Sequence, residues 1–269
     1  MTKGDENVSK FYNEVGWETD GDNTQDAILF EDLRNCAKEY VTKCRLRVLR
    51  HIPAQGENML DMASGPIQYQ EYLEYSKNFK KRYCVDLSSK ALSDAKKRIG
   101  SHGEYFHGNF LDIDFENNLF DCTVSLHTIY HIDKDKQENA VRKMLAVTKP
   151  GAPVIIVYSN PDALVRRVIR LPRRLKELFG SRAKSEQVEQ NEFNLYFYPH
   201  PLDFWERFQD IAKVEKFPWR SFSSNFQKKL IPDNRLGREM LSVLYSMEDR
   251  FPKFFVRNFQ YPMIILRKY

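Results

Sequence analysis

Short apolar runs alternate with amphipathic stretches between residues 55 and 160. The runs typical of β-strands lie around 59–60 and at 83–86, 104–107, 120–126 and 153–160. The stretches with helix signals lie at 66–76, 90–99 and 133–147. Strands that alternate with helices in this way predict βαβ units and a parallel sheet.

The chain is less regular on both sides of this region. Residues 26–52 predict a helix, because apolar positions from Tyr40 to Ile52 recur at spacings of three and four before Pro53. Asn160-Pro161 resembles the cap and first turn of another helix, which is rich in arginine. The elements expected after it are a helix at 201–208, a strand at 214–219, a helix near 235–248 and a final strand at 261–268.

The stretch at 58–67, NMLDMASGPI, has a composition that suits ligand binding. Its turn from Ala63 to Gly65 carries little side-chain bulk, so a ligand could approach the backbone closely. Pro66 suits the first position of a helix. A strand, a glycine-containing turn and a helix N-terminus form the place where open α/β sheets bind nucleotide-like ligands. An ordinary strand-to-helix connection is the alternative interpretation.

Polar side chains follow three of the expected strands, at Asp61, Asp86 and Asn109. The carboxyl ends of parallel strands share one edge of a sheet, so these side chains are expected to line one crevice. Asp86 follows Asp61 at close to the offset of roughly 20 residues at which an acid binds ribose hydroxyls. An amide such as Asn109 both donates and accepts, which suits the edge of an adenine ring.

The turn lacks the three glycines that a dinucleotide fold usually carries, since Gly65 is the only one in MASGPI. Pro66 also removes one N–H group from the helix end. Both features disfavour a ligand with a diphosphate. They are compatible with a nucleoside ligand that has no phosphate.

Four stretches together resemble the motif series of class I S-adenosylmethionine (SAM)-dependent methyltransferases, and more narrowly the small-molecule methyltransferases. They are LDMASGP, VDLSSKALSDAKKR, GNFLDIDFENNLFDCTVSLHTIYHI and VTKPGAPVIIVYSNP. The resemblance covers about residues 55–160 and a final strand pair. It implies an α/β fold with a Rossmann-like seven-stranded, mostly parallel sheet, a last strand that runs antiparallel, and a helical cap. The implied cofactor is SAM.

The resemblance also implies roles for individual residues around the cofactor. Asp61 would hold the methionine amino group, Ala63, Ser64 and Gly65 would form the turn beneath the cofactor, and Asp86 would bind the ribose. Leu87, Asn109 and Phe110 would lie against the adenine, and Leu126 and His127 near the sulfonium. Tyr12 and Trp17, in the polar segment 1–25, are candidates to cover the cofactor, with packing against the body as the alternative.

Methyl transfer to a hydroxyl requires removal of a proton, and a histidine titrates near neutrality. His127 and His131 follow the fourth strand, where the crevice opens, and His127 is the first candidate base. His200 lies beside aromatic residues at 193–198 and is a further candidate. Each histidine could instead be a packing residue, and the aromatic residues could form either an acceptor pocket or core.

The sequence predicts four segments. Residues 1–54 form an N-terminal arm and helical cap, 55–160 the SAM-binding core, and 161–200 a cap or lid insertion. Residues 201–269 complete the core and carry a helix inserted between the last two strands. This inserted helix either adds to the cap or makes a homodimer contact.

Composition limits the location and the partners. The 269 residues carry a net charge of +5, and no apolar run is long enough to span a bilayer. The polar N-terminus lacks the apolar core of a signal peptide. The four cysteines show no metal-ligand spacing, so no metal is expected. We therefore expect a cytoplasmic protein with reduced cysteines.

The acceptor class is open at this stage. Ser125-Leu126-His127-Thr128 departs from the Asn/Asp-Pro-Pro-aromatic tetrad of enzymes that methylate DNA or glutamine amides, which disfavours DNA. The basic run at 166–176 could be a solvated helix face, or it could face an anionic acceptor or a membrane surface. RNA is a disfavoured partner, because nothing resembles a separate nucleic-acid module.

The sequence favours a methyltransferase that acts on a small molecule, anionic or aromatic, at a hydroxyl oxygen. Three alternatives remain. They are an RNA methyltransferase that uses the basic run, a non-catalytic SAM-binding protein, and a nicotinamide-dependent oxidoreductase.

Overall fold

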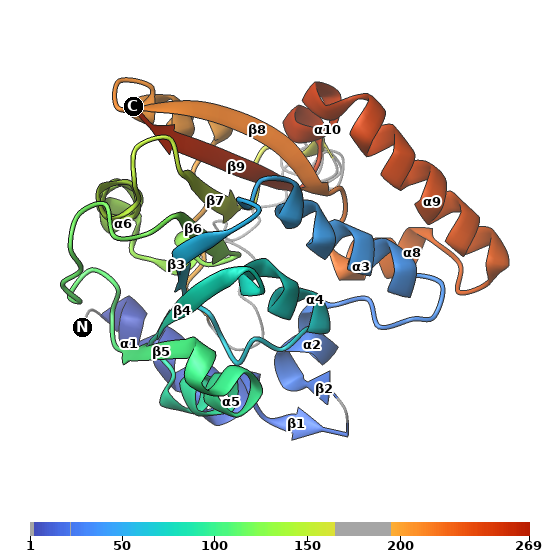
Figure 1. The fold of residues 1–269 in the computed structure, drawn as a ribbon. Helices are drawn as coiled ribbons and strands as arrows, with labels where there is room; N and C mark the ends of the chain where they lie inside the picture. Colours follow the sequence, from blue (N-terminus) through green and yellow to red (C-terminus); the bar gives the residue numbers. More distant parts are fainter. Residues whose placement is uncertain (1–2, 22, 165–194) are drawn as a thin grey trace, which may run out of the picture.

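A computed structural model describes residues 3–21, 23–164 and 195–269, and its centre is a seven-stranded sheet (Figure 1). The strands are β3 (Gly56–Met62), β4 (Phe79–Asp86), β5 (Gly103–His107), β6 (Cys122–Leu126), β7 (Pro153–Val157), β8 (Ala212–Arg220) and β9 (Tyr261–Lys268). Their order in space is β5-β4-β3-β6-β7-β9-β8. β9 runs antiparallel to both of its neighbours, as predicted for the last strand.

Helices cover both faces of this sheet. They include α3 (Lys38–Leu46), α4 (Gln70–Leu73), α5 (Ser89–Ile99), α6 (Gln137–Val147), α8 (Ser224–Leu230), α9 (Arg235–Arg250) and α10 (Pro252–Asn258). Alternate strand residues point to opposite faces. Leu60 and Ile156 therefore pack in the cluster that includes α6, while Met59 and Ile155 pack in the cluster that includes α3. The result is a three-layer α/β/α arrangement.

The N-terminal segment has more structure than its polar composition predicted. It forms α1 (Lys3–Phe11), a short π-helix (Tyr12–Gly16), a small hairpin of β1 (Thr19–Asp20) and β2 (Asn23–Thr24), and α2 (Gln25–Phe30). Phe11 and Trp17 are buried. These aromatic residues therefore anchor the segment to the rest of the molecule.

The single helix predicted over 26–52 was wrong, because the chain breaks between α2 and α3. Glu31 adopts an extended conformation, and its carboxylate accepts a hydrogen bond from the N–H of Asp32. Asp32 in turn binds the guanidinium of Arg34. Both acids are buried, and their hydrogen bonds hold the backbone outside the helical conformation.

The helix expected to open at Pro66 was also wrong, since α4 begins at Gln70 and a short 3₁₀ helix (Glu74–Ser76) follows it. Ile67 has a positive φ of 55°, which a right-handed helix excludes. The segment expected as a helix at 201–208 is a 3₁₀ helix (Leu202–Phe208). The basic run at 166–176 lies outside the described residues.

No helix in the described part of the chain is both long and apolar enough to cross a bilayer. All four cysteines are buried and unpaired, as expected.

A buried ion pair joins α9 to the segment that directly follows α3. Glu248 is fully buried and binds the guanidinium of Arg47, which is 1% exposed, at 2.6 Å. The same carboxylate accepts hydrogen bonds from the hydroxyl groups of Tyr40 at 2.7 Å and Ser221 at 2.6 Å. The carboxylate of Glu248 therefore holds Arg47, Tyr40 and Ser221 together in the interior.

Glu248→Ala is expected to lower the free energy of unfolding by about 3–5 kcal/mol, because it leaves the Arg47 charge buried without its main partner. Urea denaturation measures the change. The neighbouring Asp249→Ala removes a partly exposed partner of Arg47 and Arg50 and should cost less than about 1 kcal/mol. Equal losses in the two variants would contradict this account.

Candidate active site

The turn after β3 and the end of β4 are joined through one carboxylate. Asp86 accepts a hydrogen bond from the N–H of Gly65 at 2.8 Å and another from the N–H of Ser88 at 2.8 Å. The N–H of Ser64 donates to the carbonyl of Val85 at 3.1 Å. Burial raises the pKa of Asp86 to about 6, although these two N–H groups oppose the rise. The carboxylate thus lies at the carboxyl edge of the sheet.

The backbone of the turn after β3 is strained at every second residue from 63 to 67. Ala63, Gly65 and Ile67 have positive φ values of 60°, 55° and 55°. Such conformations cost residues other than glycine of order 1–3 kcal/mol each and cluster at functional sites. A Cβ at Gly65 would lie 3.1 Å from the ring of Trp17, so Trp17 would have to shift to accommodate a side chain there.

The N-terminal segment lies across these turns. Trp17, which contacts Gly65, stacks on Tyr12 with 4.9 Å between the ring centroids. The hydroxyl of Ser9 donates to the carbonyl of Leu87 at 3.1 Å, and the hydroxyl of Ser88 donates to the amide oxygen of Asn13 at 2.7 Å. Contacts therefore join the segment to the turns after both β3 and β4.

The residues present fit an adenosine-type cofactor without phosphates. Each oxygen of Asp86 accepts one N–H group and keeps capacity for a hydroxyl donor. The indole N–H of Trp17 is buried without a hydrogen-bond partner beside the turn. Pro66 leaves the turn with one donor fewer for a diphosphate.

The structure gives Asp61 a strong partner. Its carboxylate binds the guanidinium of Arg82, with the Nε–H donating at 3.0 Å, and both side chains are buried. Arg82 also donates to the carbonyl of Tyr72 at 2.6 Å. Asp61 therefore fixes α4 to the sheet through Arg82, in addition to the cofactor role that was predicted for it.

The two residues expected to flank the adenine, Asn109 and Phe110, lie in different surroundings. Asn109 follows β5, and its amide oxygen accepts the N–H of Leu111 at 2.9 Å. The ring of Phe110 is 3% exposed and packs in the core, with the ammonium of Lys143 over it. The N–H of Gly108 donates to the carbonyl of Asp86 at 3.0 Å, which brings the end of β5 to the end of β4.

Of the three candidate histidines, His127 alone directly follows a strand of the sheet. Leu126 ends β6, and His127 has a φ of 60°. Its Nδ1 lies 3.1 Å from the hydroxyl of Tyr130, and its ring packs against Trp219 at 4.6 Å. Burial and the positive charge of Arg220 lower the pKa of His127 to about 3. The neutral ring is therefore a weak base.

The other two histidines have structural partners. The Nδ1–H of His131 donates to the carbonyl of Tyr196 at 2.6 Å, and burial lowers its pKa to about 4. His200 stacks on Phe204 with 4.4 Å between the ring centroids, and its Nε2 lies 3.5 Å from the carbonyl oxygen of Lys134. These contacts do not connect His131 or His200 to the turns after β3 and β4.

Sequence reasoning missed a cluster of buried charges beside His127. The carboxylate of Glu31 binds the guanidinium of Arg220, at the end of β8, and that of Arg45 at 2.8 Å. Burial alone would raise the pKa of Glu31, but the two guanidiniums lower it to about 2. The Nε–H groups of both arginines are buried without a hydrogen-bond partner. Spacing along the chain gave no signal, because these residues meet only in the fold.

Asp26, in the first turn of α2, was missed for the same reason. Its carboxylate accepts a hydrogen bond from the amide of Gln68 at 3.0 Å, and Gln68 accepts the hydroxyl of Thr24 at 2.6 Å. Burial raises the pKa of Asp26 to about 6. After burial, the charge of Asp26 is the next cause that raises the pKa of Tyr12, and Asp86 adds to it. Tyr12 is thus close to both carboxylates.

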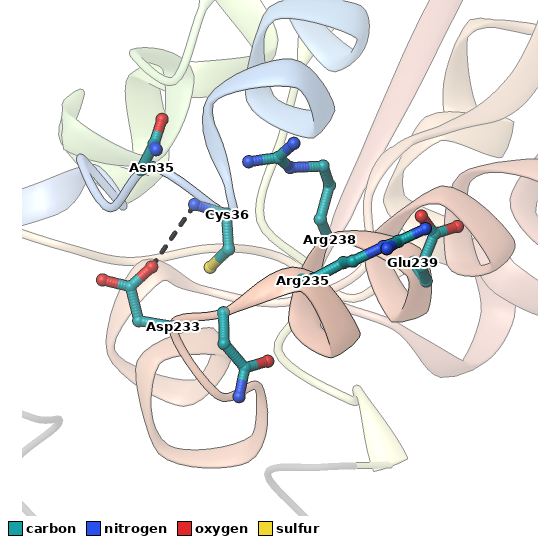
Figure 2. Close-up of a pocket in the computed structure, with 7 residues that line it drawn as sticks. Asn35, Cys36, Asp233, Arg235, Arg238 and Glu239 are labelled. Atoms are coloured by element: carbon teal, nitrogen blue, oxygen red, sulfur yellow. Dashed lines mark hydrogen bonds between the residues drawn. The ribbon is translucent and has the colours of Figure 1, made fainter.

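A separate pocket of about 690 Å³ lies at the start of α9 (Figure 2). Its lining includes Cys36, Asp233, Arg238 and Glu239, and the carboxylate of Asp233 accepts the N–H of Cys36 at 3.3 Å. No lining residue comes from the carboxyl edge of the sheet, so this pocket is distinct from the site above. Among the described residues no cluster of three side chains could hold a metal ion.

Comparison with known proteins agrees with this geometry. Residues 60–156 match a family model described as a methyltransferase domain. Three solved structures of similar fold each have a TM-score of 0.57. One is a complex titled "DhpI-SAM-HEP", with 14% identity over 99% of both chains. Another is the N-methyltransferase NodS from Bradyrhizobium japonicum with S-adenosylhomocysteine (SAH), with 13% identity over 97% of this chain and 98% of that one.

The third is geranyl diphosphate C-methyltransferase from Streptomyces coelicolor, with 14% identity over 100% of this chain and 98% of that one. At these identities the likeness concerns the fold. The strand order agrees with the matched domain. Residues 60–156 are therefore a methyltransferase domain, and the chain has the fold of solved methyltransferase structures that contain SAM or SAH.

Gly65→Ala is expected to weaken SAH binding roughly tenfold or more, because the new Cβ displaces Trp17 and tilts the turn. Calorimetric titration measures the affinity. Gly100→Ala is the matched control, since Gly100 has a φ of 52° and open space around it. Both variants should lose about 1–2 kcal/mol of stability from backbone strain, but only the first should lose affinity. Unchanged binding in Gly65→Ala would show that SAH binding does not require a close approach of the ligand to the backbone at Gly65.

Asp86 is expected to make SAH binding dependent on pH. In the folded protein the pKa of Asp86 is about 6, above the ordinary value of 3.8. The proton on Asp86 therefore stabilises the unliganded fold fully below about pH 4, and this stabilisation is lost as the pH rises through 6. A ribose hydroxyl prefers the ionised carboxylate. The dissociation constant should therefore rise about tenfold from pH 7 to pH 5. Asp86→Asn should bind weakly with a flat profile, and a flat profile in the wild type would contradict the assignment.

Proposed function

We propose that the chain is a SAM-dependent methyltransferase that acts on a small-molecule acceptor and transfers the methyl group to a hydroxyl oxygen. The observation that carries the proposal is the cover made by the N-terminal segment. Trp17 packs on Gly65, Tyr12 lies near Asp86 and Asp26, and Ser9 binds the turn after β4. A site covered in this way suits a small acceptor better than a macromolecule.

The cofactor supplies a methyl group on a sulfonium, which is already activated for displacement. The chain must then hold the cofactor, align the acceptor, exclude water and accept a proton. We assign Asp86 to the ribose and the turn from Ala63 to Gly65 to the support of the cofactor. We assign Tyr12 and Trp17 to the exclusion of water, because Trp17 contacts the turn at Gly65 and Tyr12 stacks on Trp17.

The acceptor side is assigned to the buried charges next to His127. Arg220 uses one Nη to bind Glu31, and its Nε–H has no hydrogen-bond partner. Trp219 and Tyr261 lie beside its guanidinium, with 4.9 Å and 5.3 Å to the ring centroids. This combination of a cation and aromatic rings supports an acceptor that carries an anionic or an aromatic group. A protein of similar fold is named as acting on geranyl diphosphate, a small molecule with anionic groups.

Asp26 replaces His127 as the proton acceptor in this proposal. A pKa of about 3 makes His127 a poor base at neutral pH, whereas a carboxylate with a pKa of about 6 is ionised and more basic than an exposed acid. Tyr130 is linked to both residues. Its hydroxyl contacts His127, and the charge of Asp26 contributes to the rise in its pKa.

Labelled methyl transfer from SAM to a panel of small hydroxylated compounds tests the function. Turnover should yield SAH and a methylated small molecule. Incorporation into RNA alone would favour the RNA methyltransferase, and tight SAH binding without any turnover would favour a non-catalytic SAM-binding protein.

Asp26→Asn is expected to lower kcat by about 10²–10⁴-fold at saturating SAM, because the amide cannot accept the proton. The affinity for SAH should stay within a factor of about two, since an amide oxygen at this position can still accept the hydrogen bond from Gln68. Asp94→Asn, on the outer side of α5, is the control and should retain full activity. If Asp26→Asn kept wild-type kcat, the proton acceptor would have to be another group.

A further inference from the structure

The outer side of α9 carries a continuous apolar stripe that continues into α10. Leu236, Met240, Val243 and Met247 are between 40% and 62% exposed, and Phe251 is 53% exposed. Their spacings of four, three, four and four residues place them on one side of a helix. Large apolar side chains gathered on one exposed face are typical of an interaction surface.

The stripe is held rigidly and faces outward. About a third of a turn away around α9, Leu241 and Glu248 are buried, and Glu248 binds Arg47 of the segment after α3. Figure 1 shows α9 as the long helix at the outer edge of the molecule, with α3 beside it. A partner would therefore meet the stripe without any rearrangement of the helix.

The stripe is nearly symmetric about its midpoint at Val243. Leu236 lies seven residues before this position and Phe251 eight after it, while Met240 and Met247 lie three before and four after. A second copy related by a two-fold axis through this midpoint would run antiparallel. Leu236 would then meet the partner's Phe251, and Met240 would meet the partner's Met247. Such self-complementarity is what a two-fold interface requires.

Charges beside the stripe favour the same arrangement. Glu239 and Arg250 flank the stripe on one side, because eleven residues bring a helix back to within about 20° of the same direction. Both are exposed, and neither forms an ion pair within the described part of the chain. In an antiparallel pair Glu239 would approach the partner's Arg250.

We propose that the chain forms a homodimer through this stripe, with α9 packed antiparallel against α9 of a second copy. The helix has 16 residues and is about 24 Å long. Phe254 of α10, which is 53% exposed, extends the apolar surface beyond its end. The active site lies at the carboxyl edge of the sheet, so this proposal is independent of the acceptor and of the catalytic residues.

Sedimentation of the full chain tests the proposal. The wild type should be dimeric at about 10 μM, and Val243→Glu should lower the association constant by roughly 100-fold or more, because two carboxylates would be buried at the axis. Ser242→Glu adds the same charge on the same helix, outside the stripe, and should remain dimeric. A monomeric wild type up to about 100 μM, or a dimer that survives Val243→Glu, would overturn the proposal.

A cysteine at the axis tests the geometry. Val243→Cys should form a disulfide between copies under mild oxidation, because a residue near a two-fold axis lies close to its own symmetry mate. The four native cysteines are buried, so they give little background. Ser242→Cys should cross-link at least tenfold more slowly, and equal rates for the two variants would contradict the proposed axis.

Discussion

The site depends on the hydrogen bonds that Asp86 makes with the backbone of two turns. One carboxylate at the end of β4 holds the N–H of Gly65 from the turn after β3 and the N–H of Ser88 from its own turn. This contact fixes a strained backbone in which Ala63, Gly65 and Ile67 all have positive φ. Gly65 has no side chain, and Trp17 packs on the backbone there. The cover, the turn and the carboxylate therefore form one structural unit.

Much of the core could be predicted from the sequence. The alternation of strands and helices between 55 and 160 predicted the parallel sheet, because burial imposes a regular period on such elements, and the resemblance to methyltransferases implied the antiparallel last strand. The placement of Asp86 at the sheet edge followed from the same pattern. Irregular features could not be predicted in this way. Ile67 breaks the expected helix through its backbone conformation. The break at Glu31 depends on hydrogen bonds of buried acids, and one partner of Glu31, Arg220, lies 189 residues away in the chain.

Asp26 is a better candidate than His127 for the proton acceptor, and the reason is electrostatic. His127 was the first candidate base because histidine ordinarily titrates near neutrality. In the fold its ring is buried beside Arg220, so its proton is lost far below neutral pH. Burial has the opposite effect on an acid, and Asp26 becomes more basic in the same region. Sequence motifs report residue types, whereas this reversal depends on what surrounds each residue.

Calorimetric titration of the full chain with SAM, SAH and NAD tests the central claim most directly. The account predicts one site per chain that binds the two sulfur cofactors at micromolar concentration, no binding of NAD, and loss of SAH binding in Asp86→Ala while the variant stays folded. Absence of heat with both sulfur cofactors in a folded sample would contradict it. Binding of NAD in their place would move the chain to the nicotinamide-dependent oxidoreductases.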